Sequence, residues 1–78
     1  MEELTQRITF NQHVLHGKPV IRGLRISVEM ILELLAKGSS QQEILEDFPE
    51  LEPEDIAAAL SYASRLIAGE LVFERIGS

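Results

Sequence analysis

The chain has no cysteine and no tryptophan, and its aromatic residues are three Phe and one Tyr among 78 residues. The lack of cysteine excludes disulfide bonds and thiolate metal sites. No stretch approaches the roughly 18 consecutive apolar residues that a membrane-spanning helix needs. Residues 1–4 also lack the basic and apolar regions of a signal peptide. These absences predict a cytoplasmic protein without a membrane anchor.

Basic residues are scarce as well, since seven Lys and Arg face thirteen Asp and Glu, for a net charge of −6. A domain that binds nucleic acid alone is usually basic, because Lys and Arg contact the phosphates. The charges are unevenly placed, with basic residues gathered before residue 26 and carboxylates crowded into residues 43–55. Such an acidic surface suits a basic protein partner better than a nucleic acid.

Apolar residues, by contrast, make up 45% of the chain, which is high for so small a domain. Part of this apolar surface is expected to be buried against a second copy, so we predict a homodimer. The order of patterns predicts a mainly α protein of the α+β class, with a short N-terminal β ribbon followed by three helices. We expect one domain over residues 1–78. Its expected parts are a frayed segment (1–6), the β ribbon (7–26), the three-helix body (27–69) and a C-terminal tail (70–78).

Local signals place the elements within this outline. Short paired strands are expected at residues 7–10 and 19–22, which hold alternating or β-branched apolar residues. Helices are expected at residues 28–37, 41–47 and 53–68. The helix starts are marked by Ser27 as an N-cap, by a capping box from Ser40 to Glu43 and by Pro53 at the first helical position. In the loop before the third helix, Leu51 is expected to be a buried apolar residue. The core face of the third helix is expected to hold Ile56, Leu60, Ala63 and Ile67.

Three motifs carry a family resemblance: GKPVI at residues 17–21, ILEDFP at residues 44–49 and PEDI at residues 53–56. From residue 8 to about residue 67, the chain resembles the domain-of-unknown-function family 433. It departs from the family at Leu24 and Glu52, where the family usually has Thr. The resemblance implies a small, homeodomain-like, VapB-type antitoxin of prokaryotes, encoded beside a PIN-like ribonuclease toxin. Such a protein would mask the toxin and regulate its own operon.

Two other functions stay open: a stand-alone helix-turn-helix regulator that binds operator DNA, and an interaction or scaffold domain without nucleic-acid binding. In a helix-turn-helix, the start of the third helix would meet the DNA, but Glu52, Glu54 and Asp55 would repel phosphates there. If DNA is bound, we expect the β ribbon to bind it, doubled by a dimer axis. The candidate nucleic-acid-binding residues are Lys18, Arg22 and Arg25. Alternatively, Arg22 and Arg25 pair with helix carboxylates and fix the ribbon on the body.

No catalytic constellation is present in the sequence. His13 and His16 stand three residues apart, but zinc usually takes four N or S ligands and no cysteine can complete the set. Ser27 and Ser40 suit helix caps better than nucleophiles. We therefore expect no enzymatic activity, cofactor, metal or small-molecule substrate.

The tail at residues 70–78 mixes apolar and charged residues. We predict that it binds a partner through Leu71, Val72 and Phe73 as anchors. Arg75 would be the charged tip that enters the acidic, metal-holding cluster of a PIN-like nuclease. The alternatives are that the tail packs on its own domain or that Arg75 is simply exposed.

Overall fold

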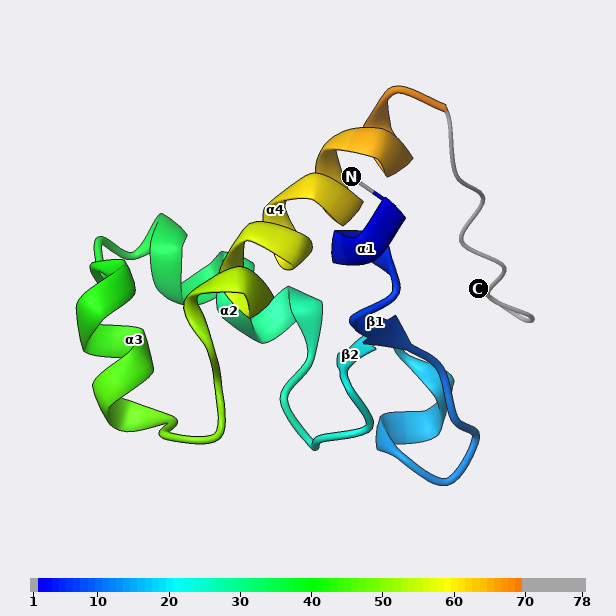
Figure 1. Cartoon of the computed structure of the whole chain (residues 1–78), viewed down its shortest axis with the longest axis horizontal. Coiled ribbons are helices and arrows are strands. Elements are labelled where there is room, and N and C mark those ends of the chain that lie inside the picture. Colours follow the sequence, from blue (N-terminus) through cyan, green and yellow to red (C-terminus); the bar gives the residue numbers. More distant parts are fainter. Residues whose placement is uncertain (1, 70–78) are drawn as a thin grey trace.

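The computed structural model describes residues 2–69 of the chain (Figure 1). It confirms a mainly α fold in which a short β ribbon precedes three longer helices. The elements in order are α1 (Glu2–Thr5), β1 (Ile8–Thr9), the 3-10 turn η1 (Leu15–Gly17), β2 (Val20–Ile21), α2 (Val28–Ala36), α3 (Gln41–Asp47) and α4 (Pro53–Ile67). Among these described residues, no helix has the length and apolarity needed to cross a bilayer.

The two strands pair antiparallel, with Ile8 opposite Ile21 and Thr9 opposite Val20. The ribbon is therefore where the sequence predicts it, although each strand is shorter than expected. Strand β2 ends because Arg22 adopts a left-handed conformation, with φ of +46°, which an extended strand does not contain. The inward-facing side chains of Ile8 and Ile21 belong to the hydrophobic core.

The helix starts follow the predicted capping signals. Ser27 Oγ accepts a hydrogen bond from the Met30 N–H at 2.9 Å, at the start of α2. The capping box of α3 is complete: Ser40 Oγ accepts from the Glu43 N–H at 3.1 Å, and Glu43 Oε1 accepts from the Ser40 N–H at 2.8 Å. Pro53 occupies the first turn of α4 as expected. These capping signals therefore determine the residue at which each of the three helices begins.

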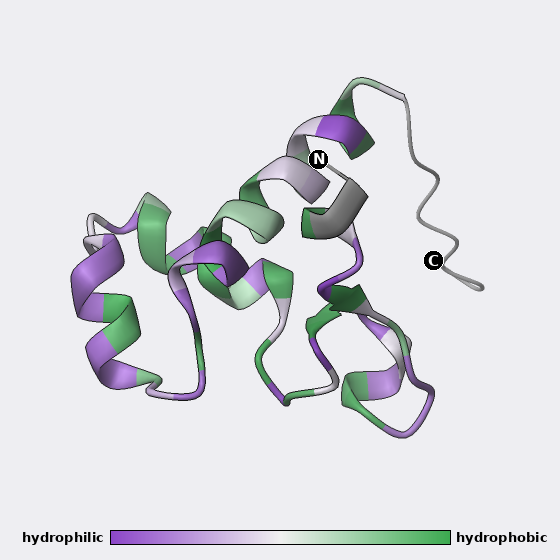
Figure 2. Cartoon of the chain, viewed as in Figure 1, coloured by the Kyte–Doolittle hydropathy of each residue, from purple (hydrophilic) through white to green (hydrophobic). Residues whose placement is uncertain are grey.

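Helix α4 packs against α1, α2, α3 and β1, so it is the central element of the fold (Figure 1). Leu51, in the loop between α3 and α4, is buried in the core, as predicted. In Figure 2 the short strands are hydrophobic, whereas α3 alternates between hydrophilic and hydrophobic bands. The fully buried apolar side chains of the core are Val20, Ile21, Ile31, Ile44, Ile56, Ala58 and Ala59.

The predicted core stripe of α4 is wrong at two positions. Leu60 is 43% exposed and Ile67 is 87% exposed, while Ile56 is buried as expected. The inward face instead runs through Asp55, Ala59 and Tyr62, which also recur at helical spacing. A wholly buried carboxylate thus lies on the face that the hydrophobic pattern alone would not include.

The N-terminal segment also differs from expectation. Residues 1–6 are predicted to be frayed, but residues 2–5 form one turn of helix, α1, which contacts α4. Leu4 packs against the hydrophobic core and supplies the apolar contact that orders this turn. The tail predicted at residues 70–78 lies outside the described residues.

Candidate functional site

A cluster of ion pairs joins the β ribbon to the start of α4, and the Asp55 side chain, with no exposed surface, lies at its centre. Arg7 Nη1 donates to Asp55 Oδ1 at 2.9 Å. Arg22 contacts both carboxylate oxygens, with Nε 3.1 Å from Oδ1 and Nη2 2.9 Å from Oδ2. The Glu52 N–H donates to Oδ2 at 2.8 Å. The buried charge is therefore paired with two guanidinium groups and hydrogen-bonded to the main chain, as a buried carboxylate requires.

The local backbone directs both arginines toward Asp55. The turn at the end of β2 uses positive φ at Arg22 and at Gly23 (+75°), a conformation that is easy for glycine but uncommon for arginine. The Arg22 N–H donates to the Arg7 carbonyl at 2.7 Å, so the two residues lie side by side at the ribbon's end. Arg22 Nη2 also donates to the Glu50 carbonyl at 2.8 Å, and Arg7 Nη1 donates to Glu52 Oε1 at 2.8 Å. The cluster thus ties the ribbon to the α3–α4 loop as well.

The electrostatics favour a permanently charged cluster. Burial alone would raise the pKa of the Asp55 carboxyl, but hydrogen bonds from Arg22, from the Glu52 N–H and from Arg7 outweigh burial and hold this pKa below its usual value. Hydrogen bonds to Glu52 and Asp55 raise the pKa of Arg7, and those to Asp55 raise the pKa of Arg22. Asp55 therefore has no proton to exchange near neutral pH, and the cluster suits attachment of the ribbon better than acid–base chemistry.

The structure does not gather the three predicted nucleic-acid-binding residues into one patch of free cations. Arg22 pairs with Asp55, which is the alternative that the sequence left open for it. Lys18 Nζ lies 3.1 Å from Glu29 Oε1 on the surface of α2. Arg25 is exposed and forms no ion pair within residues 2–69. Of the three, Arg25 is the one that has no carboxylate partner in the part of the chain that the structure describes.

Sequence reasoning missed the role of Asp55 because it treated Asp55, together with Glu52 and Glu54, as a surface carboxylate that would repel DNA phosphates. Asp55 is wholly buried, whereas Glu54 beside it is exposed. One signal was available: Asp55 lies three residues after Glu52, the spacing of a capping box, in a protein whose ribbon carries two arginines. That spacing directs an N3 carboxylate back toward the preceding loop and away from solvent.

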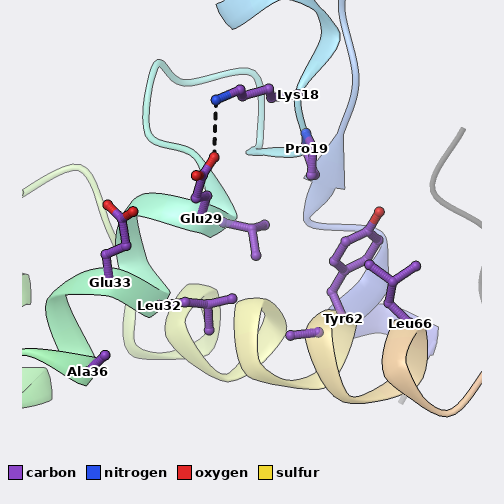
Figure 3. A pocket seen from close by; sticks show the side chains of 10 residues that line it. Lys18, Pro19, Glu29, Leu32, Glu33, Ala36, Tyr62 and Leu66 are labelled. Atoms are coloured by element: carbon purple, nitrogen blue, oxygen red, sulfur yellow. Dashed lines mark hydrogen bonds and ion pairs between the residues drawn. The ribbon is translucent and has the colours of Figure 1, made fainter. Parts of the chain in front are cut away.

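A second feature is an apolar groove of about 620 Å³ between α2 and the C-terminal half of α4 (Figure 3). Tyr62 lines it with a buried hydroxyl that has no hydrogen-bond partner among residues 2–69, and burial raises the pKa of this hydroxyl. Lys18 and Glu29 form their ion pair at the rim, and Glu33 lies farther along α2. The lining residues are Lys18, Pro19, Val28, Glu29, Leu32, Glu33, Ala36, Tyr62, Ala63 and Leu66.

The remaining positions that the sequence singles out are the two histidines and the residues of the C-terminal tail. His13 and His16 are both exposed. Within residues 2–69, no three His, Cys, Asp or Glu side chains are placed to hold a metal ion. The predicted partner-binding residues Leu71, Val72, Phe73 and Arg75 lie outside the described residues, so their role stays a prediction.

Comparison with known proteins identifies relatives of this fold and sequence. A curated protein of Sinorhizobium fredii, "Uncharacterized protein y4eO", is 38% identical over 56 residues, which cover 72% of this chain and 25% of that protein. The chain thus matches about a quarter of the relative's length.

A solved structure extends the likeness to three dimensions. The crystal structure of a DUF433 member protein from Anabaena variabilis superposes with a TM-score of 0.76 at 28% identity, over 88% of this chain and 68% of that chain. Residues 8–63 match the family described as "Protein of unknown function (DUF433)". The chain therefore belongs to the DUF433 family, as its motifs predict.

Proposed function

We propose that this protein is a non-enzymatic, antitoxin-like module that binds and masks a basic protein, with a PIN-like ribonuclease as its partner. The observation that carries the proposal is the uncompensated negative charge along α3 and the start of α4. None of the exposed carboxylates there forms an ion pair with Lys or Arg within residues 2–69, apart from Glu52 with Arg7. The unpaired carboxylates are Glu43, Glu46, Asp47, Glu50 and Glu54.

Charge of one sign on one face speeds encounter with an oppositely charged partner and selects against wrong ones. A ribonuclease that binds RNA phosphates through Lys and Arg presents such a positive surface. The acidic face of α3 and α4 would compete with RNA for that surface. In the same complex, Leu71, Val72 and Phe73 are the expected apolar anchors, and Arg75 is the residue expected to enter the nuclease's acidic cluster.

The test is co-expression with the protein encoded beside this one, followed by RNA cleavage assays on the complex and on the free partner. Cleavage is expected to fall in the complex. Glu46→Lys combined with Glu50→Lys is expected to weaken binding by about tenfold or more at low salt, with a smaller loss at high salt because salt screens exposed charges. Glu33→Lys on α2 is the control and should leave binding unchanged. A neighbouring protein that is neither bound nor inhibited contradicts the proposal.

A second candidate, operator-DNA binding, is favoured by two observations. Helices α3 and α4, joined by residues 48–52 and preceded by α2, follow the order of a helix-turn-helix. Arg25 is exposed with no carboxylate partner within residues 2–69. Titration of salt against promoter DNA tests this function: if Arg25 binds a phosphate, Arg25→Ala reduces the salt dependence of the affinity by about one ion. Arg25 is a cleaner probe than Arg22, because Arg22 also holds the fold together.

The predicted homodimer needs its own measurement. Leu60 and Ile67 are large apolar side chains exposed on α4 and are suited to a contact between copies. Size-exclusion chromatography with light scattering gives the mass directly. A dimeric mass supports the explanation that the surplus apolar surface is buried against a second copy. A monomeric mass at all micromolar concentrations contradicts that explanation. An interaction domain without nucleic acid is the function left if neither nuclease nor DNA binds.

A further inference from the structure

The exposed side of α2 carries a row of charged side chains with opposite signs at its two ends. Glu29, Glu33 and Lys37 recur at intervals of four residues and so form one line along the helix, with Lys37 as the C-cap. All three are exposed. Glu29 pairs with Lys18, whereas Glu33 and Lys37 form no ion pair within residues 2–69. A carboxylate and an ammonium group one helical turn apart are therefore both available to a charged partner.

This charged row borders the apolar groove between α2 and α4 (Figure 3). Leu32 and Ala36 line the groove from α2, and Ala63 lines it from α4. Ala36 is exposed, and its small side chain lets another helix approach α2 closely. Apolar surface exposed in one place on a small domain marks an interaction site. The charged row and the groove thus form one surface, which we call the α2 face and define by Leu32, Glu33, Ala36 and Lys37.

The α2 face is complementary to itself. Where two copies meet about a two-fold axis, a residue of one copy faces a second residue of the other, and the reverse contact is made as well. With the two α2 helices antiparallel and the axis near Leu35, Glu33 of each copy lies beside Lys37 of the other. In the same register, Leu32 of each copy lies beside Ala36 of the other, so a large side chain meets a small one. A parallel pair would instead place Glu33 against Glu33 and Lys37 against Lys37.

We propose that a second copy of this chain covers the α2 face, with the two α2 helices antiparallel and paired through Glu33 and Lys37. The groove of each copy is then covered by the α2 helix of the other. This inference goes beyond the proposed function, since it depends neither on a nuclease nor on DNA. It assigns the predicted contact between copies to α2 and leaves Ile67 outside the contact, because Ala36 and Leu66 lie at opposite ends of the groove (Figure 3).

Exchange of the two charges tests the pairing in the full-length chain. Glu33→Lys and Lys37→Glu each place like charges across the axis, so each variant alone is expected to raise the dissociation constant of the dimer about tenfold. A one-to-one mixture of the two variants restores both pairs in a heterodimer and should recover the wild-type constant. Sedimentation equilibrium at about 0.15 M salt measures the masses, since salt screens the repulsion between two copies of net charge −6. A mixture as weakly associated as its components, or a wild-type chain that stays monomeric, overturns the proposal.

A pair of alanine substitutions tests the close approach of the two helices without a change of charge. Ala36→Gln places a longer side chain where the helices meet and is expected to raise the dissociation constant about tenfold. Ala57→Gln makes the same change on an exposed alanine of α4 that does not line the groove, and it should leave the constant unchanged. Circular dichroism checks that both variants fold. Equal constants for the two variants contradict the proposal, as does a dimer that is lost in Ile67→Ser and kept in Ala36→Gln.

Discussion

The two ends of α4 invert the usual arrangement of side chains. At its start, Asp55 is charged and completely buried, whereas at its end Ile67 is apolar and 87% exposed. The start is held by the ribbon arginines, and the end borders an open groove. The comparison teaches that this helix is oriented by a few long-range polar contacts, and that the hydrophobic pattern follows that orientation only in part.

The largest expected effect comes from the start of the helix. Asp55→Asn leaves Arg7 and Arg22 without their shared carboxylate and is expected to lower the free energy of unfolding by about 3–5 kcal/mol, as when one member of a buried ion pair is removed. Asp47→Asn makes the same chemical change on an exposed carboxylate and should cost no more than about 0.5 kcal/mol. Urea unfolding followed by circular dichroism compares the two. Equal losses would show that Asp55 is not the anchor of the ribbon.

Acid should weaken the same end of α4. Because the pKa of Asp55 is lowered in the folded state, the stability that it contributes is fully present above the unfolded-state pKa of about 3.9 and is lost as pH falls through the lower folded-state pKa. We expect wild-type stability to fall as the pH drops below about 4, and the part of this fall that comes from Asp55 should be no larger than the Asp55→Asn loss. Urea midpoints at pH 6 and pH 3 measure this change. Since Asp55→Asn lacks the carboxyl, its midpoint should vary less over the same range.

A smaller effect is expected from the basic residues of the ribbon, where a paired and an unpaired arginine can be compared. Arg22→Ala removes charge-assisted hydrogen bonds to a buried partner and is expected to cost about 1.5–3 kcal/mol. Arg25→Ala, three residues along, should change stability by less than about 0.5 kcal/mol because Arg25 is exposed and has no ion-pair partner within residues 2–69. Thermal unfolding of both variants checks the difference. If the losses are similar, the bonds between Arg22 and Asp55 contribute little to stability.

Features that depend on residues close together in the sequence could be predicted, whereas features that depend on distant residues could not. Ser27, Ser40 and Pro53 mark helix starts through contacts with residues three or fewer positions away, and the sequence predicts these starts correctly. It also predicts the pairing of the two strands, because the β-branched runs are short and separated by turn residues. Each of these features is encoded within a few consecutive residues.

The burial of Asp55 could not be predicted in the same way. The capping-box spacing from Glu52 indicates only that the Asp55 side chain turns back toward the preceding loop. Its partners Arg7 and Arg22 lie 48 and 33 positions away in the chain, and no local pattern indicates that the ribbon's end meets the start of α4. Once that contact forms, the inward face of α4 is fixed, and Leu60 and Ile67 are left on the surface. The predicted stripe is wrong because it optimises apolar burial in the helix alone, whereas the fold also satisfies a buried charge.

The smallest expected effect lies at the end of α4 and tests whether that end is free in solution. Ile56→Val removes one methylene group from a fully buried side chain and should cost about 1 kcal/mol. Ile67→Val makes the same change on the 87% exposed side chain and should cost almost nothing. Chemical unfolding of both variants at two protein concentrations measures the pair. If Ile67→Val costs as much as Ile56→Val, and more at the higher concentration, a second copy covers this end of the helix. In that case Ile67 would be exposed only in the isolated chain, and the two ends of α4 would both be buried in the dimer.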